Sequence, residues 1–400
     1  METVILGWYI MVQTGSVLLL TTFGSLLLLG TLASPMFGVL GDRLGFRVML
    51  SVMRAIYTGL AALVLLLALT DTLTPAWVLV VAALVGLVRP NDQGMRNALI
   101  GETIPPPHLM SAVGLSRVTM DSARIFGALG GAALSTVLGL GPTYVLVTIF
   151  YVASFALTFG VARRPVTPDP AQTWRGASSS VAVASPSRGR DLLDGLLYVL
   201  RLPALHAMMW LAFLVNLTAY PVSSGLLPYV ARNIYLVDAT GLGWLAASFA
   251  LGSLVGSIVT VVTGGPRRPE RSMLIYTALW YLALLAFGNL KSINTGLPVL
   301  LLAGFVQSVA MIAMTANLLS ASDERFRGRV MGVRTLAIYG MPLGLMGAGV
   351  LIERIGYALT VNVFTAVGLF FTLFIGVKWR ASLWPPRRMP SGATPGTVRP

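Results

Sequence analysis

The sequence has no cysteine, only two histidines and few charged side chains. The absence of cysteine excludes disulfide bonds, thiolate metal sites and cysteine nucleophiles, and His108 and His206 alone cannot form a zinc site. Charged residues make up 10% of the 400 residues, against about 25% in an average soluble domain. A water-soluble protein of this length needs far more polar surface, so the composition excludes an ordinary soluble domain.

Long apolar runs take the place of the missing charge, and hydrophobic residues make up 56% of the chain. A helix needs ~20 apolar residues to cross a bilayer, and these runs are too long for the strands of a transmembrane barrel. We therefore predict an all-α, polytopic membrane protein. Its twelve apolar segments are Val4–Val12, Ser16–Phe37, Val48–Leu69, Ala76–Leu99, Ala112–Leu138, Pro142–Ala162, Ala204–Tyr220, Leu242–Thr263, Met273–Leu290, Leu297–Ser320, Val330–Ile352 and Tyr357–Val377.

A polar stretch rich in proline and serine divides these segments into two groups of six. Such a composition cannot bury a core, so it predicts a flexible linker. Its end, Asp191–Arg201, carries leucines at helical spacing and predicts an amphipathic helix on the membrane surface. The predicted units are an N-terminal bundle at 1–162, a linker at 163–203, a C-terminal bundle at 204–378 and a disordered tail at 379–400.

An internal repeat relates the fifth segment to the eleventh. Arginine and glycine recur at a constant separation of 217 residues, pairing Arg117 with Arg334, Gly127 with Gly344, Gly130 with Gly347 and Gly139 with Gly356. The two positions are equivalent within their halves and have the same orientation. The repeat therefore predicts two six-helix bundles related by a parallel duplication.

The basic residues fix the predicted topology. Arginine and lysine concentrate in every second loop, in the linker and in the tail, and cationic loops stay in the cytoplasm. The linker and the C-terminus are therefore predicted to be cytoplasmic. The net charge of +14 is scattered over many short loops, which argues against a nucleic-acid partner. We expect a monomer in a lipid bilayer.

A glycine-rich, charged motif lies between the second and third segments, and consists of Gly38, Gly41, Asp42, Arg43, Gly45 and Arg47. It resembles the G-x-x-x-D-R-x-G-x-R signature of the major facilitator superfamily. The resemblance implies that Asp42 lies near the start of helix 11, toward Gly328–Met331, and helps to latch the two halves together on the cytoplasmic side. The alternative is that these charges are solvated and only enforce topology.

The resemblance extends to the bacterial drug and siderophore exporters of that superfamily, which include macrolide-efflux proteins and the enterobactin exporter. It is carried by Arg96–Leu99, Leu227–Arg232 and Arg327–Gly332, among others. It implies a bacterial inner membrane, a small-molecule substrate, a proton as coupling ion and no cofactor. Ala128 replaces the proline of the G-P-x-x-G-G motif of drug antiporters, which weakens the antiport signal at that position.

The first segment is short. Its nine apolar residues, Val4–Val12, would span ~14 Å as a helix, whereas the hydrocarbon core of a bilayer is ~30 Å thick. We therefore expect helix 1 to be incomplete, with a reading frame that begins upstream of Met1. The alternative function is that of a non-transporting, degenerate membrane protein that lacks an intact helix 1.

Ionisable residues at membrane depth are functional candidates, because each is costly to bury in a bilayer. They gather in segments 4 and 5, as Arg89, Asp92, Arg96, Arg117, Asp121 and Arg124. One interpretation is a proton relay or a site for a charged substrate. The other is a set of structural ion pairs between helices.

Polar residues of helices 7 and 10 complete the candidates, because the resemblance implies that helices 1, 4, 7 and 10 line a central cavity. They are Asn216, Tyr220, Gln307 and Asn317, and the alternative for each is interhelical packing. The sequence contains no nucleotide-binding glycine loop, metal-ligand cluster or catalytic triad. We therefore predict no catalytic residue, metal or cofactor, and a transporter that exports drug-like or siderophore-like molecules by proton-coupled alternating access.

Overall fold

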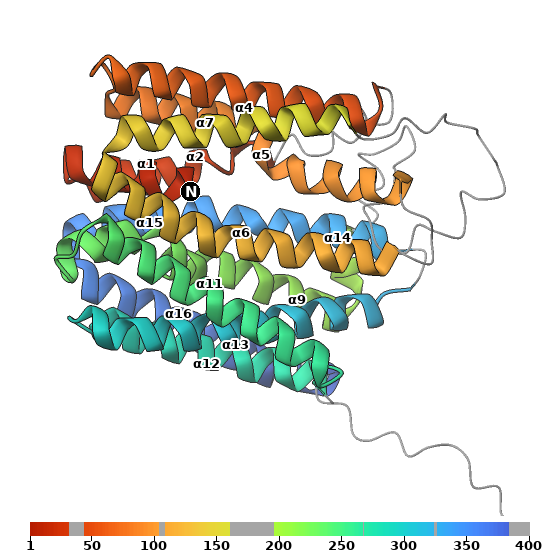
Figure 1. Cartoon of the computed structure of the whole chain (residues 1–400). Coiled ribbons are helices and arrows are strands. Elements are labelled where there is room, and N and C mark those ends of the chain that lie inside the picture. The colour runs from red at the N-terminus through yellow and green to blue at the C-terminus, as the bar shows by residue number, and fades with distance from the viewer. Residues whose placement is uncertain (32–43, 104–108, 161–195, 267, 324–325, 384–400) are drawn as a thin grey trace, which may run out of the picture.

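The structure is a computed structural model that describes residues 1–31, 44–103, 109–160, 196–266, 268–323 and 326–383. Every regular element in those residues is a helix, which confirms the predicted all-α class. Figure 1 shows the helices running side by side, with the N-terminal ones (red to yellow) above the C-terminal ones (green to blue). Eight described helices are long and apolar enough to cross a membrane, and Val17–Thr31 and Pro75–Arg89 are shorter apolar stretches.

The N-terminal half forms one group of packed helices. They are α1 (Glu2–Thr14), α2 (Val17–Leu26), the short η1 (Leu29–Thr31), α4 (Phe46–Leu69), α5 (Pro75–Thr103), α6 (Leu109–Leu138) and α7 (Leu140–Phe159). Their core gathers buried side chains of α1, α2, α4, α5 and α7, among them Ile10, Met53 and Tyr144. α1 is short, as predicted, with 13 residues. It begins against the middle of α6, where Met1 packs on Gly127 and Gly131.

The C-terminal half forms the second group. Its elements are α9 (Pro203–Leu214), η3 (Val215–Ala219), η4 (Pro221–Gly225), α10 (Leu227–Tyr229), η5 (Val230–Ile234), α11 (Ala239–Val262), α12 (Pro269–Asn289), α13 (Ile293–Ser320), α14 (Arg327–Leu336), η6 (Ala337–Tyr339), α15 (Gly340–Ile355), α16 (Tyr357–Lys378) and α17 (Arg380–Leu383). α11 and α13 pack tightly, because Gly252 and Gly304 let each backbone touch the other. Trp280 and Tyr281 are fully buried in the core of this half.

The seventh segment corrects the predicted boundary. It was predicted to end at Tyr220, but the helical path continues as one span from Pro203 to Ile234. Pro221 and Pro228 have no amide hydrogen to donate, so each removes a bond from the ordinary helical ladder. The chain adopts π-helical turns instead, with the Leu226 amide donating to the Pro221 carbonyl at 2.9 Å. Such turns are rare and frequent at functional sites.

The two halves meet along two seams, α6 with α11 and α2 with α15. At the first seam Gly243 faces Ala128 and Ala132, and the Thr240 hydroxyl donates to Thr136 Oγ1 at 3.2 Å. Both threonines lie near the end of the molecule at which α1 meets α2, which we call the Gly15 end (Figure 1).

At the second seam Gly349 packs on Leu18 and Thr21, and the Ser25 hydroxyl donates to the Pro342 carbonyl at 3.1 Å. Gly349 and Thr21 also lie near the Gly15 end. On the predicted topology this is the outer end.

The predicted linker and tail lie mostly outside the described residues, so their boundaries stay predictions. Residues 196–201, the end of the predicted amphipathic helix, are helical. Val199 is buried in a core with α9 and α14, and the Tyr198 ring stacks on Phe326 at a centroid distance of 4.3 Å. The first residues of the predicted disordered tail form α17. The described end of the linker thus packs on the C-terminal bundle.

Candidate functional site

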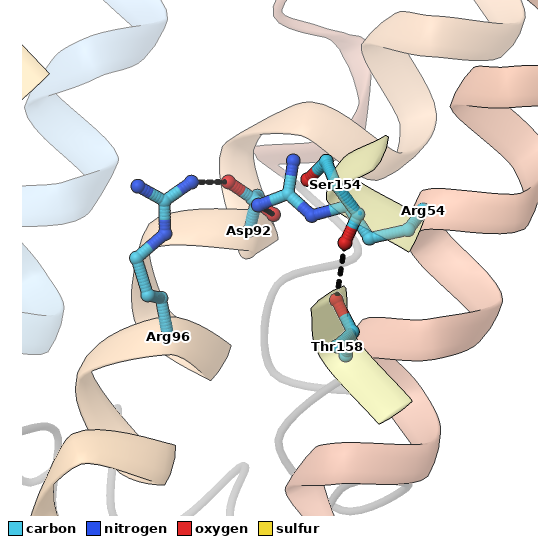
Figure 2. Close-up of polar contacts among 5 residues, drawn as sticks. All are labelled: Arg54, Asp92, Arg96, Ser154 and Thr158. Carbon is cyan, nitrogen blue, oxygen red and sulfur yellow. Dashed lines mark hydrogen bonds and ion pairs between the residues drawn. The ribbon is translucent and has the colours of Figure 1, made fainter. Parts of the chain in front are cut away.

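A three-charge cluster joins α4 to α5. Asp92 Oδ2 accepts a hydrogen bond from the Arg96 guanidinium at 2.7 Å, one helical turn away. Asp92 Oδ1 lies 2.9 Å from Nη2 of Arg54 on α4. Figure 2 shows Asp92 between the two arginines, with Ser154 and Thr158 of α7 beside Arg54. The side chains of Arg54 and Asp92 are 13% and 16% exposed, so the pair is largely removed from solvent and ties α4 to α5.

Arg89, the other predicted partner of Asp92, points to a different helix. Its guanidinium donates to Thr3 Oγ1 at 3.0 Å. The neighbouring Glu2 carboxylate accepts from the Tyr151 hydroxyl at 2.7 Å, so the first turn of α1 is bound to both α5 and α7. A cavity of about 190 Å³ opens beside it, lined by Met1, Glu2, Arg54, Val147, Phe150, Tyr151 and Ser154. Sequence reasoning assigned no site role to Glu2, because its place before the first apolar segment gave no sign of these partners.

The second predicted cluster lies on α6. Asp121 is 7% exposed, and its carboxylate lies 3.9 Å from the guanidinium of Arg124, whose side chain is 55% exposed. Arg117 lies in the same helix, and its side chain is outside the described residues. α6 is also the helix that forms the seam with α11. A change in the charge of Asp121 therefore acts on a helix at the boundary between the halves.

Part of the Gly38–Arg47 motif lies outside the described residues, namely Gly38, Gly41, Asp42 and Arg43. The predicted approach of Asp42 to helix 11 therefore stays a prediction. Gly45 immediately precedes α4 with a φ of 87°, a conformation that glycine adopts without strain. Arg47 donates to the carbonyls of Thr158, at 3.4 Å, and Phe159. These carbonyls belong to the last turn of α7, beyond the regular i to i+4 ladder, so Arg47 caps α7 and ties it to α4.

Two separate groups of polar contacts join helices of the C-terminal bundle. The Gln307 amide on α13 donates to Tyr220 Oη at 2.8 Å, and its carbonyl accepts from the Ser253 hydroxyl of α11 at 3.4 Å. Further along α13, Thr315 Oγ1 accepts from the Arg334 guanidinium of α14 at 2.9 Å. Two of the predicted cavity residues, Tyr220 and Gln307, are thus brought together.

The other two predicted cavity residues are placed differently. Asn216 donates to the Ala212 carbonyl of its own helical path at 2.8 Å. Asn317 is 1% exposed, and neither atom of its amide has a hydrogen-bond partner in the described part of the chain. Sequence reasoning also assigned no site role to Arg54 or Arg334. The repeat that pairs Arg334 with Arg117 was the signal that could have found the second of these.

The sequence is similar to those of known membrane transporters. The uncharacterized MFS-type transporter YfiS of Bacillus subtilis is 23% identical over 274 residues, which cover 66% of this chain and 62% of the relative. The enterobactin exporter EntS of Shigella flexneri is 25% identical over 258 residues, or 63% of this chain and 56% of the relative. The match thus spans about three fifths of the length of these curated relatives.

Solved structures share the fold along nearly the whole chain. The nucleoside transporter NupG superposes with a TM-score of 0.68 at 14% identity, covering 96% of this chain and 95% of its own. The human organic anion transporter MFSD10 gives a TM-score of 0.57 at 16% identity, covering 90% and 83%. The sequence model of the Major Facilitator Superfamily matches residues 3–344. The chain therefore belongs to the major facilitator superfamily of membrane transporters.

Proposed function

We propose that this protein exports small organic molecules by alternating access, in exchange for protons. The observation that carries the proposal is the arrangement of the seams. Two repeat-related bundles touch through glycine and threonine contacts near the Gly15 end, while polar side chains stand inside the C-terminal bundle. Bundles that rock about such small-residue seams expose a central site to each side in turn. The similarity to the enterobactin exporter supports the outward direction.

Asp121 is the proposed proton carrier, and Asp92 is proposed to be structural. A proton on Asp92 would neutralise the one carboxylate that lies between Arg54 and Arg96, leaving two guanidinium groups uncompensated at close range. Asp121 is buried on a helix that must move when the first seam opens. Its protonation would remove a charge from that helix, which supplies a physical link between proton binding and the change of conformation.

Transport by purified protein in lipid vesicles tests this function. Two dyes with the same ring system but opposite charge, anionic sulforhodamine B and cationic rhodamine 6G, serve as probes. We expect uptake of at least one dye above that of protein-free vesicles, and faster uptake when the vesicle lumen is acidic. Asp121→Asn should lose the acceleration and keep dye exchange, whereas Glu353→Gln, at an exposed helix end, should behave as the unaltered protein.

Two results would refute the proposal. If no dye crosses faster than in protein-free vesicles, the non-transporting alternative is favoured. If dyes cross but an acidic lumen never accelerates them, the protein is a facilitator without proton coupling.

A further inference from the structure

Arg334 is a mostly buried cation inside the C-terminal bundle. Its guanidinium donates to the neutral Thr315 hydroxyl at 2.9 Å, and among the described residues it forms no ion pair with a carboxylate. A buried charge without a counter-charge is expensive, and Arg334 stands at the start of the membrane-spanning stretch Val333–Ile355. Some anion is therefore expected to neutralise Arg334 in the working protein.

The internal repeat shows what is missing around Arg334. In the N-terminal half, Arg117 is followed four residues later by Asp121, on the same face of the helix. The equivalent positions in the C-terminal half are Arg334 and Ile338. The duplication thus retains the arginine in both halves and the carboxylate in only one. In the C-terminal half an isoleucine stands where the counter-charge would be, so a carboxylate for Arg334 has to come from elsewhere than this helix position.

The surroundings of Arg334 supply further groups for an anion. The Tyr220 phenol lies within electrostatic reach of the guanidinium and accepts a hydrogen bond from the Gln307 amide at 2.8 Å. Thr315 contacts the cation directly and donates its own proton to the Met311 carbonyl, so the Tyr220 phenol is the hydroxyl that remains to donate to an anion. A guanidinium fork binds two oxygens of a carboxylate or sulfonate at once. This chemistry suits an organic acid better than an inorganic point charge.

We propose that Arg334 binds the acidic group of an amphipathic organic anion, with Tyr220 and Thr315 beside it, and that this anion is the class of substrate. The inference rests on the proposed transport function and adds the charge of the cargo. It selects the anionic class over the cationic one, because the nearest ionic group of the site is positive.

Dye binding to detergent-purified protein, followed by fluorescence anisotropy, tests the site. The unaltered protein should bind sulforhodamine B more tightly than rhodamine 6G. Arg334→Gln should weaken the binding of sulforhodamine B at least about thirtyfold, the lower end of what loss of one partner of a buried charged contact produces. Arg334→Lys should fall in between, because it retains the charge without the fork. Arg354→Gln, which removes an exposed cation at the end of α15, is the matched control and should bind like the unaltered protein.

A second variant keeps the test decisive if Arg334→Gln fails to fold. Ile338→Asp restores in the C-terminal half the carboxylate that Asp121 supplies in the N-terminal half. The new carboxylate should pair with Arg334 and weaken the binding of sulforhodamine B at least tenfold. It should not lower the thermal stability of the protein. Unchanged affinity for sulforhodamine B in either folded variant, or preference of the unaltered protein for rhodamine 6G, would overturn the proposal.

The binding and transport assays fail separately. Binding of sulforhodamine B that depends on Arg334, without flux in vesicles, leaves the anion site standing and refutes the transport function. Dye flux that neither Arg334→Gln nor Ile338→Asp changes supports the transport function and refutes the anion site.

Discussion

Asp92 holds the most closely packed charges in the described part of the chain, because two arginines approach its two oxygens at 2.9 and 2.7 Å. Asp92→Asn leaves both cations partly buried and repelling each other. We expect the free energy of unfolding to fall by about 3 kcal/mol, the lower end for a broken buried pair, since the aspartate is 16% exposed. Thermal and denaturant unfolding of the purified variant, followed by tryptophan fluorescence, measures the loss.

The control for this change is Asp71→Asn. Asp71 is exposed, and its φ of 51° lies in the left-handed region, which asparagine tolerates. The free energy of unfolding of Asp71→Asn should stay within about 0.5 kcal/mol of that of the unaltered protein. The double variant Arg54→Gln, Asp92→Asn should lose less than the sum of the two single changes, because each removes the same contact. Additive losses would mean that the cluster contributes no pairing energy.

At the scale of helices, the contact between α11 and α13 depends on glycine. A Cβ at Gly252 would overlap the Leu301 carbonyl oxygen, which belongs to the backbone and has no room to retreat. We expect Gly252→Ala to destabilise the protein by about 1–3 kcal/mol through overpacking. Gly59→Ala is the matched control, since Gly59 is an exposed helical glycine with nothing within 4 Å of the added carbon.

The free energy of unfolding of the Gly59→Ala control should rise by up to about 1 kcal/mol, because alanine is a better helix former than glycine. Both changes are read as shifts in the unfolding midpoint of the purified protein. Equal effects at Gly252 and Gly59 would show that helix propensity, and not the approach of two backbones, decides the outcome.

Much of the helical architecture could be predicted from the sequence, because the bilayer demands long apolar runs and these need no knowledge of packing. The predicted end of segment 7 at Tyr220 was wrong, since a π-helical turn, Pro221–Gly225, carries the helical path onward. Contacts between helices were harder to predict from the sequence. Arg54 was given no site role from the sequence, yet it lies against Asp92, and only the packing of α4 on α5 decides that.

The same limit applied to Arg47. Its partners are carbonyls at the end of α7, and no spacing within the motif indicates a partner more than a hundred residues away. Arg89 likewise lies with Thr3 instead of Asp92, although helical spacing allows both. Spacing thus identifies the polar face of one helix, while the partner on the next helix depends on how the two are rotated.

For the whole molecule, alternating access requires the seam between α6 and α11 to open. Thr136 and Thr240 lie across that seam with their hydroxyl oxygens 3.2 Å apart, close enough for cysteines to form a disulfide. The chain has no cysteine of its own, so Thr136→Cys, Thr240→Cys places a single crosslink. We expect oxidation to stop dye transport in vesicles and reduction to restore it, because the bundles cannot part while they are joined.

The crosslink is verified by inserting a protease site between residues 163 and 195, since the cleaved halves then stay together on a gel only while the disulfide is intact. The matched control is Ser257→Cys, Ser308→Cys, which joins two side chains whose hydroxyl oxygens lie 2.8 Å apart within one bundle. Rigid-body rocking leaves that distance unchanged, so its oxidation should not affect transport. If the crosslinked seam transported dye at the rate of the reduced protein, the bundles would have to move without parting at α6 and α11. The rocking mechanism would then be wrong for this protein.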